Sequence, residues 1–371
     1  MLWLGVSAAA IWLLVLVLPW RSWSTRERID VPQSVPAVEP GRVGVLVPAR
    51  NEAATIAQTL ESVAGQPGVA LLVVVDDQSS DATAVIAARL PGVKVVDGQP
   101  APPGWSGKLW ALQQGLDRID SPLVLLLDAD IRLAPGMLAA LVDKLEREQL
   151  DQVSIMAQLP NISLPEKLLL PAFVFFFKQI YPFAWVNRDD RPFAAAAGGC
   201  VLVRRECLLR AGAFSAWKGA LIDDCEMALR VRGAGGKIWL GLSHGVQSMR
   251  RHPDFESILE TVRRTAYTQL GYSPAWLLAA SLLMCLAFAV PVLALCAGLV
   301  LADGPLLASG AVGWLLMAAA YAPQVRFSGL GLHWALSLPF SAALFLRASW
   351  ESAWLHHFGR GAGWKGRRYT R

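Results

Sequence analysis

The stretch VVVDDQSSDAT, residues 73–83, joins an apolar, β-branched run to a cluster of aspartates. The stretch LVLLLDADIRL, residues 123–133, repeats this arrangement further along the chain. Continuous runs of valine and leucine are typical of strands that are buried on both faces of a parallel sheet. Such sheets bind ligands at the carboxyl ends of their strands, so we expect both acidic clusters to line one cleft. The clustered residues are Asp76, Asp77, Asp81, Asp128 and Asp130.

The middle of the chain alternates between strand-like and helix-like segments. Apolar runs are followed by segments with helical spacing, such as TIAQTLESVAGQ at 55–66 and DATAVIAARL at 81–90. This alternation predicts an α/β fold with a mostly parallel sheet. Further helices are expected to begin near Lys108 and after Pro135. The predicted strands are 42–50, 70–77, 93–97 and 123–130.

The aspartates have two possible roles. An acid just before a helix can cap it, and for Asp81 capping and ligand binding are equally open. A cap needs one acid, so capping does not explain Asp76 next to Asp77. It does not explain Asp128 and Asp130 either, because two carboxylates so close together repel each other unless a cation joins them. A hard divalent ion with few protein ligands, completed by phosphate oxygens, meets that need, and we favour it over a solvated turn for the second pair.

The composition is too apolar for an ordinary soluble enzyme. Hydrophobic residues make up 54% of the 371 residues, charged residues only 17%, and the mean hydropathy is +0.40. Four windows without Lys, Arg, Asp or Glu approach the roughly 20 residues of a membrane-spanning helix. These windows are 2–20, 265–302, 304–325 and 327–346.

The apolar windows place a soluble domain between membrane segments. Arg21, Arg26 and Arg28 follow the first window, and the C-terminal tail is also basic. Positive flanks favour the cytoplasmic side, so we expect a multi-pass protein of the cell inner (plasma) membrane with a cytoplasmic domain. The net charge of +5 suits anionic lipid headgroups rather than nucleic acid. The predicted parts are an N-terminal transmembrane anchor (1–22), the domain (41–270), two or three membrane segments (274–346) and the basic tail (347–371).

Three membrane crossings after the domain conflict with placing both the domain and the basic tail in the cytoplasm. Three full crossings after the domain would leave the tail outside the cell. One of the three segments is therefore expected to be re-entrant or interfacial. Because Pro291 interrupts 274–302, this segment is the suggested one, and the choice among the three stays open.

Four motifs together resemble those of family 2 glycosyltransferases with a GT-A fold, over about 42–270. Two further stretches, PPGWSGKLWALQQG at 102–115 and WKGRRY at 364–369, resemble the hopanoid-biosynthesis-associated glycosyltransferases. Membrane enzymes that glycosylate ceramide or carotenoid acids look similar. The four motifs are VPARNE at 47–52, DDQSSD at 76–81, DAD at 128–130 and LIDDCEMALRV at 221–231.

The resemblance implies how a nucleotide-sugar donor, expected to be a UDP-sugar, is bound. Asp76 and Asp77 would hold the uracil or the nearby nucleoside, with Glu52 close to it. Asp128 would face the ribose or the sugar, and Asp130 would bind Mg²⁺ or Mn²⁺ on the diphosphate. A metal there stabilises negative charge that develops on the leaving diphosphate.

The resemblance also implies that Asp224 is the catalytic base. Such a base takes the proton of the acceptor hydroxyl as that oxygen attacks the anomeric carbon. Its neighbours Asp223 and Glu226 are expected to orient it or to raise its pKa, and the alternative is that Asp224 caps a helix. Lys108 would add positive charge at the diphosphate, or else be a helix-start lysine in solvent.

One family motif, Gln/Arg-x-x-Arg-Trp after the base, is incomplete here. The nearest stretch is ETVRRTAYTQ at 260–269, which has no Trp. Either Arg263 or Arg264 would reach the diphosphate. In processive synthases the Trp of this motif supports the growing sugar chain. Its absence here favours a single transfer over polymerisation.

An aromatic-rich stretch at 165–187 separates the metal motif from the base and contains Pro171 and Pro182. It is either a buried core helix or a segment on the bilayer surface. In the second case a lipid acceptor would enter the site without leaving the membrane.

The sequence thus predicts an inverting, metal-dependent enzyme that transfers one sugar to a hopanoid-like, ceramide-like or carotenoid-like membrane lipid. Transfer to polyprenyl phosphate is an alternative, with Arg204, Arg205 and Arg210 as candidate phosphate ligands. A non-catalytic membrane scaffold with a degenerate nucleotide-sugar domain is a second alternative. The DAD motif and the base are both present, which disfavours the scaffold.

Overall fold

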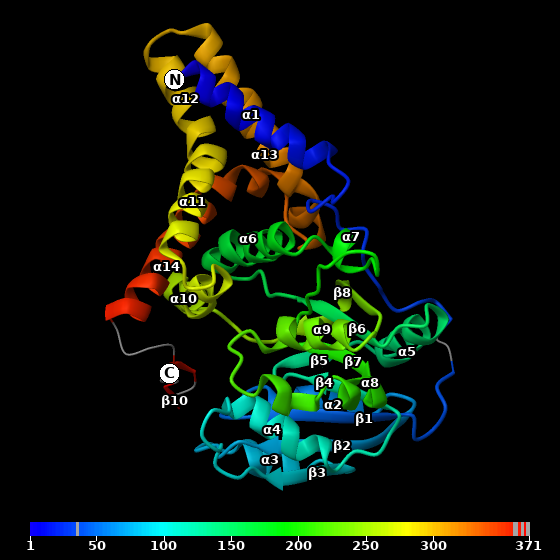
Figure 1. Cartoon of the computed structure of the whole chain (residues 1–371). Helices are drawn as coiled ribbons and strands as arrows, with labels where there is room; N and C mark the ends of the chain where they lie inside the picture. Colours follow the sequence, from blue (N-terminus) through cyan, green and yellow to red (C-terminus); the bar gives the residue numbers. More distant parts are fainter. Residues whose placement is uncertain (35–36, 359–362, 365–366, 369–371) are drawn as a thin grey trace. The chain divides into compact units, whose positions relative to one another are not determined.

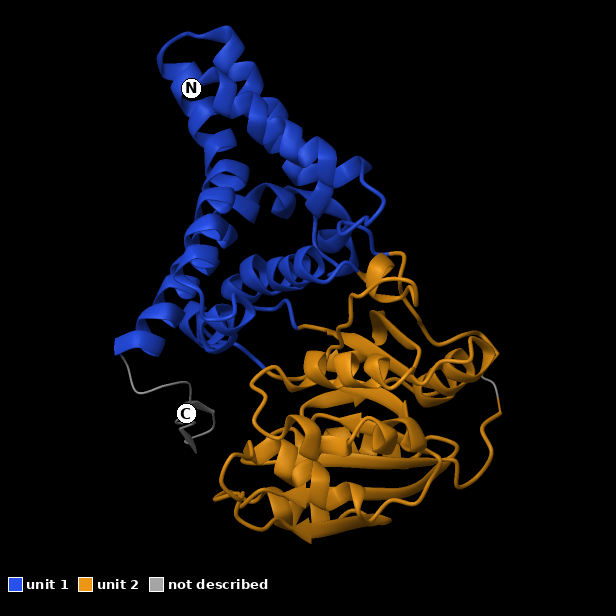
Figure 2. Ribbon diagram, viewed as in Figure 1, with its two compact units in different colours: residues 1–25, 160–182, 251–371 blue, residues 26–159, 183–250 orange. Residues whose placement is uncertain are grey.

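The computed structural model describes residues 1–34, 37–358, 363–364 and 367–368. The chain divides into two compact units (Figure 2). Each unit is assembled from segments that lie far apart in the sequence. Unit 1 comprises 1–25, 160–182 and 251–371, and unit 2 comprises 26–159 and 183–250.

The described part of unit 2 contains a mixed sheet of eight strands (Figure 1). They are β1 (Val43–Ala49), β2 (Val69–Asp76), β3 (Val93–Asp97), β4 (Leu123–Leu127), β5 (Ile131–Leu133), β6 (Gln152–Gln158), β7 (Cys200–Arg204) and β8 (Ile238–Ser248). Their order in the sheet is β3-β2-β1-β4-β7-β6-β8-β5. The first four run parallel, as do β6 and β8, whereas β7 is antiparallel to both its neighbours and β5 to β8. The sheet is mostly parallel, as predicted.

Helices connect the parallel strands, because a parallel pair needs a crossover connection. The four predicted strands and the four predicted helices of this region are all confirmed as β1–β4 and α2–α5. The antiparallel strand β7 and the small strand β5 were not predicted. The helical segments of unit 2 are α2 (Ile56–Ala64), α3 (Thr83–Ala88), α4 (Gly107–Leu116), α5 (Met137–Arg147), α7 (Phe183–Val186), α8 (Arg205–Arg210), the 3₁₀ helix η1 (Ala213–Trp217) and α9 (Asp223–Gly233).

The register of the central strands decides where the acidic motifs lie. Strand β1 lies between β2 and β4, and Ala49 at its end pairs with Asp76 at the end of β2. Leu46 and Val74 are fully buried, which fixes these strands in the core. Since all three strands run in the same direction, the segments that follow them begin at one edge of the sheet.

Unit 1 is helical apart from two short C-terminal strands. A π-helical turn, η2, joins α11 and α12 into one continuous helix. The elements of unit 1 are α1 (Leu2–Val17), α6 (Leu164–Ile180), α10 (Phe255–Gln269), α11 (Pro274–Met284), η2 (Cys285–Ala289), α12 (Val290–Val300), α13 (Gly304–Phe327), the 3₁₀ helix η3 (Leu332–Ser337), α14 (Leu338–Phe358), β9 (Gly363–Trp364) and β10 (Arg367–Arg368).

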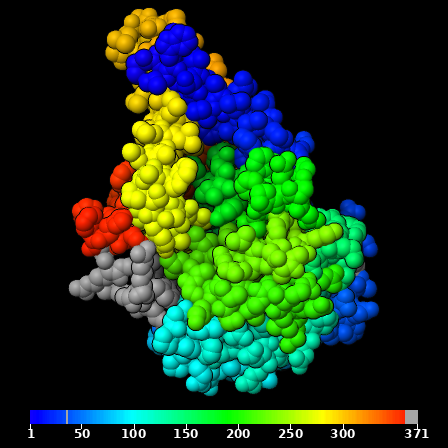
Figure 3. All heavy atoms as spheres, viewed as in Figure 1, coloured from blue at the N-terminus to red at the C-terminus, as the bar shows by residue number. Residues whose placement is uncertain are grey.

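Two helices of the described chain are long and apolar enough to cross a membrane, Pro274–Val300 with 27 residues and Gly304–Phe327 with 24. Helix α1 is apolar but shorter. The third C-terminal window, 327–346, is divided between η3 and α14 and forms no such helix. Large apolar side chains along the first of these helices are exposed, among them Trp276, Leu282 and Leu293; this helix is the yellow column in Figure 3.

Pro291 does not break the segment 274–302, contrary to the suggestion from the sequence. A proline has no N–H to donate to the carbonyl four residues earlier, which here belongs to Ala287. The π-helical turn accommodates the change, and the indole Nε1 of Trp12 donates to the Ala287 carbonyl at 2.7 Å. Helix α1 thus satisfies the one acceptor that the proline leaves open.

Helix α6 is a core helix of unit 1, which is one of the two alternatives for the aromatic-rich stretch. Leu169 and Phe175 are fully buried, and the helix packs against α10, α13 and α14. Lys178 is also buried and donates to the side chain of Gln324 on α13 at 3.3 Å. Because 160–182 and the chain from 251 pack with the helices, unit 2 is smaller than the predicted domain at 41–270.

A fully buried carboxylate begins α6. Ser163 and Glu166 form a reciprocal capping box. The Glu166 carboxylate also accepts from the backbone N–H of Ile162 and His252, both at 2.9 Å, and from Arg251 Nε at 3.1 Å. Burial alone would raise the pKa of Glu166, but these hydrogen bonds hold it at about 2.

We predict that Glu166→Gln lowers the free energy of unfolding by about 1–3 kcal/mol at pH 7, because an amide leaves buried donors without an acceptor. The folded-state pKa lies below the unfolded value, so the carboxylate stabilises the fold above pH 4.5 and loses that effect as the pH falls towards 2. Melting temperatures of the detergent-purified variant and wild type should therefore converge at low pH. A difference in melting temperature that does not depend on pH would show that the ionised carboxylate of Glu166 is not the source of the stability.

Candidate active site

The first acidic motif lies at the carboxyl end of β2. Asp76 is 8% exposed; its Oδ2 accepts from the backbone N–H of Ser79 at 3.1 Å, and its Oδ1 has no hydrogen-bond partner among the described residues. Asp77 is 3% exposed. A buried acceptor without a donor is costly, so Asp76 is set to receive an N–H or O–H from a ligand.

Asp81 has a local structural role. Its carboxylate accepts from the backbone N–H of Ala53 at 3.1 Å and of Thr83 at 3.0 Å, at the start of α3. Hydrogen bonds to Thr83 and Ala53 outweigh desolvation and lower the pKa of this carboxyl. Of the two roles that the sequence left open, the geometry favours capping.

Lys108, in the first turn of α4, joins two acidic motifs. Its Nζ lies 2.9 Å from Asp128 Oδ1 and 3.5 Å from Asp223 Oδ2. Burial by itself would lower the pKa of Lys108, but Asp128 and Asp223 raise it above its usual value of 10.5. The lysine is therefore a fixed positive charge within the site, and the alternative of a helix-start lysine in solvent is wrong.

Arg250, just after β8, bridges the carboxylates of Asp130 and Glu52. Its Nε lies 2.6 Å from Asp130 Oδ2, and its Nη2 lies 2.9 Å from Glu52 Oε1. Asp130 follows β4 and Glu52 follows β1, so one guanidinium bridges the ends of two neighbouring strands. Sequence reasoning missed Arg250; the pair Arg250–Arg251 directly after a long strand was the available signal.

Asp224 lies in the first turn of α9. Its Oδ2 accepts from the backbone N–H of Gly198 at 2.7 Å, and its Oδ1 accepts from that of Cys225 at 2.8 Å. Burial, followed by the charge of Asp223, raises the pKa of Asp224 to about 6, against the opposing effect of Lys108. The expected influence of Asp223 is thus present.

Glu226 does not take part in this arrangement. Its carboxylate pairs with Arg230 one turn later on α9, at 2.8 Å. Burial and the charges of Asp223 and Lys108 are the main influences on the pKa of Asp224 besides its backbone hydrogen bonds. Glu226 therefore serves as a matched control for its neighbour Asp223.

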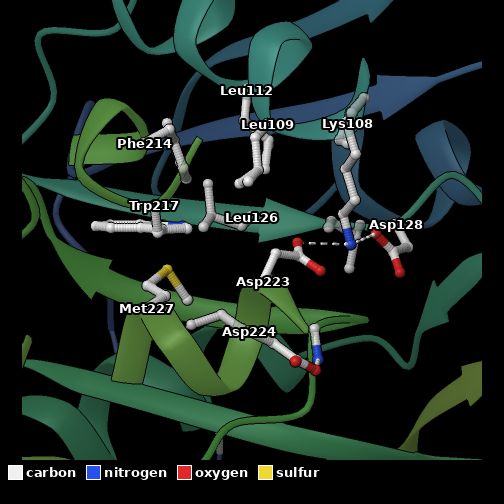
Figure 4. A pocket seen from close by; sticks show the side chains of 14 residues that line it. Lys108, Leu109, Leu112, Leu126, Asp128, Phe214, Trp217, Asp223, Asp224 and Met227 are labelled. Atoms are coloured by element: carbon white, nitrogen blue, oxygen red, sulfur yellow. Dashed lines mark hydrogen bonds and ion pairs between the residues drawn. The ribbon is translucent and has the colours of Figure 1, made fainter. Parts of the chain in front are cut away.

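Lys108, Asp128, Asp223 and Asp224 line a pocket of about 20 Å³ (Figure 4). Carboxylates and Lys108 gather at one end of it, and Trp217 lies across the other, apolar end. Trp217 is 4% exposed, and its Nε1 has no hydrogen-bond partner in the described chain. Sequence reasoning did not identify this residue. The charged residues are Lys108, Asp128, Asp223 and Asp224, and the apolar end includes Leu109, Leu112, Phe214, Trp217 and Met227.

The two arginines expected at the diphosphate belong to unit 1. Arg263, on α10, pairs there with Glu256 and with Glu351, the latter at 3.1 Å. Arg264 is the next residue of the same helix. Within unit 2, Arg250 contacts two of the predicted site carboxylates, Asp130 and Glu52.

The carboxylates fit a hard divalent cation that draws most of its ligands from a diphosphate and water. Among the described residues, no three His, Cys, Asp or Glu side chains gather as a ready-made metal site. The metal ligands predicted from the sequence are Asp128 and Asp130, and Mg²⁺ is commonly bound by one or two carboxylates plus substrate phosphates.

Comparison with known proteins decides the family. A model of the family described as "Glycosyltransferase like family 2" matches residues 40–268, well over half of the chain. The chain belongs to this family. The predicted family and enzyme class are thereby confirmed.

Two relatives add detail. The chain is 33% identical over 110 residues to the 4,4'-diaponeurosporenoate glycosyltransferase of Staphylococcus haemolyticus (strain JCSC1435), a match that spans 29% of each protein. Among solved structures, the mannosyltransferase PcManGT of Pyrobaculum calidifontis, in complex with GDP-Man and Mn²⁺, superposes with a TM-score of 0.55 and 19% identity. It covers 94% of this chain and 99% of its own. This similarity confirms the GT-A-like fold.

Proposed function

We propose that the protein transfers a single sugar, with inversion, from a nucleotide-sugar, expected to be a UDP-sugar, to a hydroxyl of a membrane lipid. The observation that carries the proposal is Asp224, a carboxylate with a raised pKa that lines the same pocket as the Lys108–Asp128 ion pair. A degenerate scaffold would have no need of such an arrangement.

The donor would bind along the edge of the sheet where β1, β2 and β4 end. The unpartnered Oδ1 of Asp76 supports a role in holding the nucleoside, together with Asp77 and Glu52. Lys108 and Asp128 would face the sugar and the diphosphate. The mannosyltransferase of similar fold carries GDP-Man, which supports a nucleotide diphosphate as the leaving group in this chain too.

A divalent metal would be held by Asp130 and Asp128. When bound, Mg²⁺ or Mn²⁺ would stabilise the charge on the departing diphosphate. The Mn²⁺ of the mannosyltransferase of similar fold supports this assignment. Lys108 supplies a second fixed positive charge, which needs no reorganisation during the reaction.

Asp224 would be the general base for the acceptor hydroxyl. Two backbone N–H groups fix its carboxylate, so the proton-accepting oxygen is positioned before the acceptor arrives. A raised pKa makes the carboxylate a stronger base than a solvent-exposed aspartate, yet leaves it ionised at neutral pH.

Membrane helices and the carotenoid-linked relative support a lipid acceptor. The relative's name specifies a carotenoid acid as its substrate, and the apolar helices of unit 1 would hold this chain at a bilayer. Hopanoid-like, ceramide-like and carotenoid-like acceptors all remain within the proposal. For polyprenyl phosphate, the candidate Arg204 is already paired with Glu146 and Arg210 with Glu206, which weighs against that alternative.

The proposed topology has α1 and the two long C-terminal helices as spans. Two crossings after unit 2, rather than three, return the basic tail to the side of Arg26 and Arg28. The conflict noted in the sequence then disappears, because the segment 327–346 is not a span. The protein would lie in the cell inner (plasma) membrane with unit 2 in the cytoplasm.

Lipid extracts test the proposed reaction. Cells producing the wild type should contain a lipid heavier by one hexose-sized unit than its precursor, whereas cells producing Asp224→Asn should not. Loss of a general base lowers turnover by about 10²–10⁴, while nucleotide affinity of the purified variant should be unchanged. Equal amounts of product from the two proteins would rule out Asp224 as the base.

The pH dependence of turnover tests the pKa of Asp224. Only the ionised form accepts a proton, so kcat/KM should fall about tenfold per unit below pH 6. Asp223→Asn removes a negative charge that raises this pKa, and the acidic limb should move to lower pH. Glu226→Gln is the control and should leave the limb in place. Equal shifts in both variants would contradict the assignment.

Cysteine labelling tests the topology. An impermeant maleimide added to intact cells should label Ala302→Cys, which lies between the two long helices, and should not label Gln33→Cys or Leu332→Cys. All three should react after permeabilisation. Labelling of Leu332→Cys in intact cells would show that the C-terminal helices do not form a two-crossing hairpin.

A further inference from the structure

Arg250 occupies Asp130, one of the two carboxylates to which a metal ion is assigned, and Glu52 beside it. Its guanidinium donates to Asp130 Oδ2 at 2.6 Å and to Glu52 Oε1 at 2.9 Å. Both acceptors are largely buried, with side chains 11% and 15% exposed, whereas the side chain of Arg250 is 45% exposed. The arginine thus reaches from the half-exposed rim into an otherwise enclosed acidic pair.

We propose that Arg250 is a displaceable counter-cation: it holds Asp130 and Glu52 while the site is free of donor, and transfers to the donor diphosphate when a divalent cation takes Asp130. This inference rests on the proposed function, because it assigns Asp130 to the metal. It makes Arg250 a positioning residue that links metal binding to donor binding.

Geometry makes the two cations competitors for Asp130. Mg²⁺ binds carboxylate oxygens at about 2.0–2.1 Å, and the guanidinium already lies at hydrogen-bond distance from the same carboxylate. Both cations on one carboxylate would place like charges a few ångströms apart in a partly desolvated site, which is unfavourable. The arginine must therefore leave Asp130, at least in part, for the metal to bind tightly.

The displaced guanidinium has a suitable new partner in the diphosphate. A planar guanidinium matches phosphate oxygens with two parallel N–H donors. The side chain of Arg250 is half exposed, so it has room to move, whereas that of Lys108 is only 23% exposed and lies between two acids. The two cations of the site therefore differ in mobility.

If Arg250 and the metal compete for Asp130, and Arg250 then binds the diphosphate, the affinities for metal and for nucleotide should be coupled. Without a diphosphate, the metal must displace Arg250 with no compensation, so its affinity is low. With a diphosphate, the arginine gains a new anion, so the two ligands strengthen each other's binding by the same factor. The site would then remain closed by its own arginine until both ligands are present.

The test measures Mn²⁺ affinity of the purified full-length protein in detergent by electron paramagnetic resonance, with and without UDP. Arg250→Met keeps length but removes charge and donors. Arg132→Met is the matched control: Arg132 lies two residues after Asp130 and loses the same charge, yet its partner is the uncharged Gln247, at 2.6 Å. Arg250→Lys keeps the positive charge but lacks the paired N–H donors of a guanidinium. It is the variant least prone to misfold.

Without UDP, Arg250→Met should bind Mn²⁺ roughly 3- to 10-fold more tightly than wild type, from the loss of two partly exposed ion pairs. The Mn²⁺ affinity of Arg250→Lys should lie between those of wild type and Arg250→Met. That of Arg132→Met should stay within twofold of wild type. UDP should increase Mn²⁺ affinity in the wild type by a larger factor than in Arg250→Met. Equal affinities and equal UDP effects in all four proteins would overturn the inference.

Asp130→Asn separates failure of this inference from failure of the proposed function. If Asp130→Asn abolishes Mn²⁺ binding while both Arg250 variants behave as wild type, the metal site stands and only the displacement is wrong. If Asp130→Asn binds Mn²⁺ as wild type does, the metal does not bind at Asp130. Both the inference and the metal-assisted reaction then fail.

Discussion

Repulsion among carboxylates at one edge of the sheet is the constraint that the site of unit 2 must satisfy. Parallel strands with a common direction bring their trailing residues together, and in this chain those residues are acids. Arg250, at the end of β8, bridges two of them, and Lys108 of α4 joins a third, Asp128, to Asp223 at the start of α9. Without these two cations the acids could stay close only by taking up protons or by binding another cation.

The acids of the site differ in how their charge is compensated. Asp128 and Asp130 each share a cation and keep an oxygen ligand set suited to a hard metal. Asp224 instead is held by two backbone N–H groups, and burial together with the charge of Asp223 raises its pKa. One cluster thus contains both acids that are paired with cations and an acid whose pKa is raised.

Much of unit 2 followed from the sequence, because valine and leucine runs and the acids after them are local signals. The strands β1–β4 were predictable in this way, whereas a common site for Lys108, Asp128 and Asp224 was implied only by the resemblance to the family. Arg250 was not predictable, because it is distant in sequence from Asp130 and only the pairing of β8 in the sheet brings it there. The motif-based expectation for Arg263 met a similar limit, since Glu256 and Glu351 engage that side chain.

The membrane segments show a different limit of sequence reasoning. Pro291 was a reasonable helix breaker on local grounds, since proline removes a backbone donor. Its effect is cancelled by Trp12, which comes from the opposite end of the chain. A hydropathy window cannot reveal such a contact.

The position of α6 in the chain has a consequence for how the protein is made. The helix is synthesised between β6 and β7, two neighbouring strands of the sheet in unit 2, yet it packs in unit 1 against α10, α13 and α14. At about 5–20 residues per second, the ribosome needs roughly 10 s to proceed from α6 to α13. During that interval the sheet can close while Phe175 and its apolar neighbours await their later partners. Until those partners emerge from the ribosome, the apolar face of α6 needs cover from a chaperone or from the lipid surface.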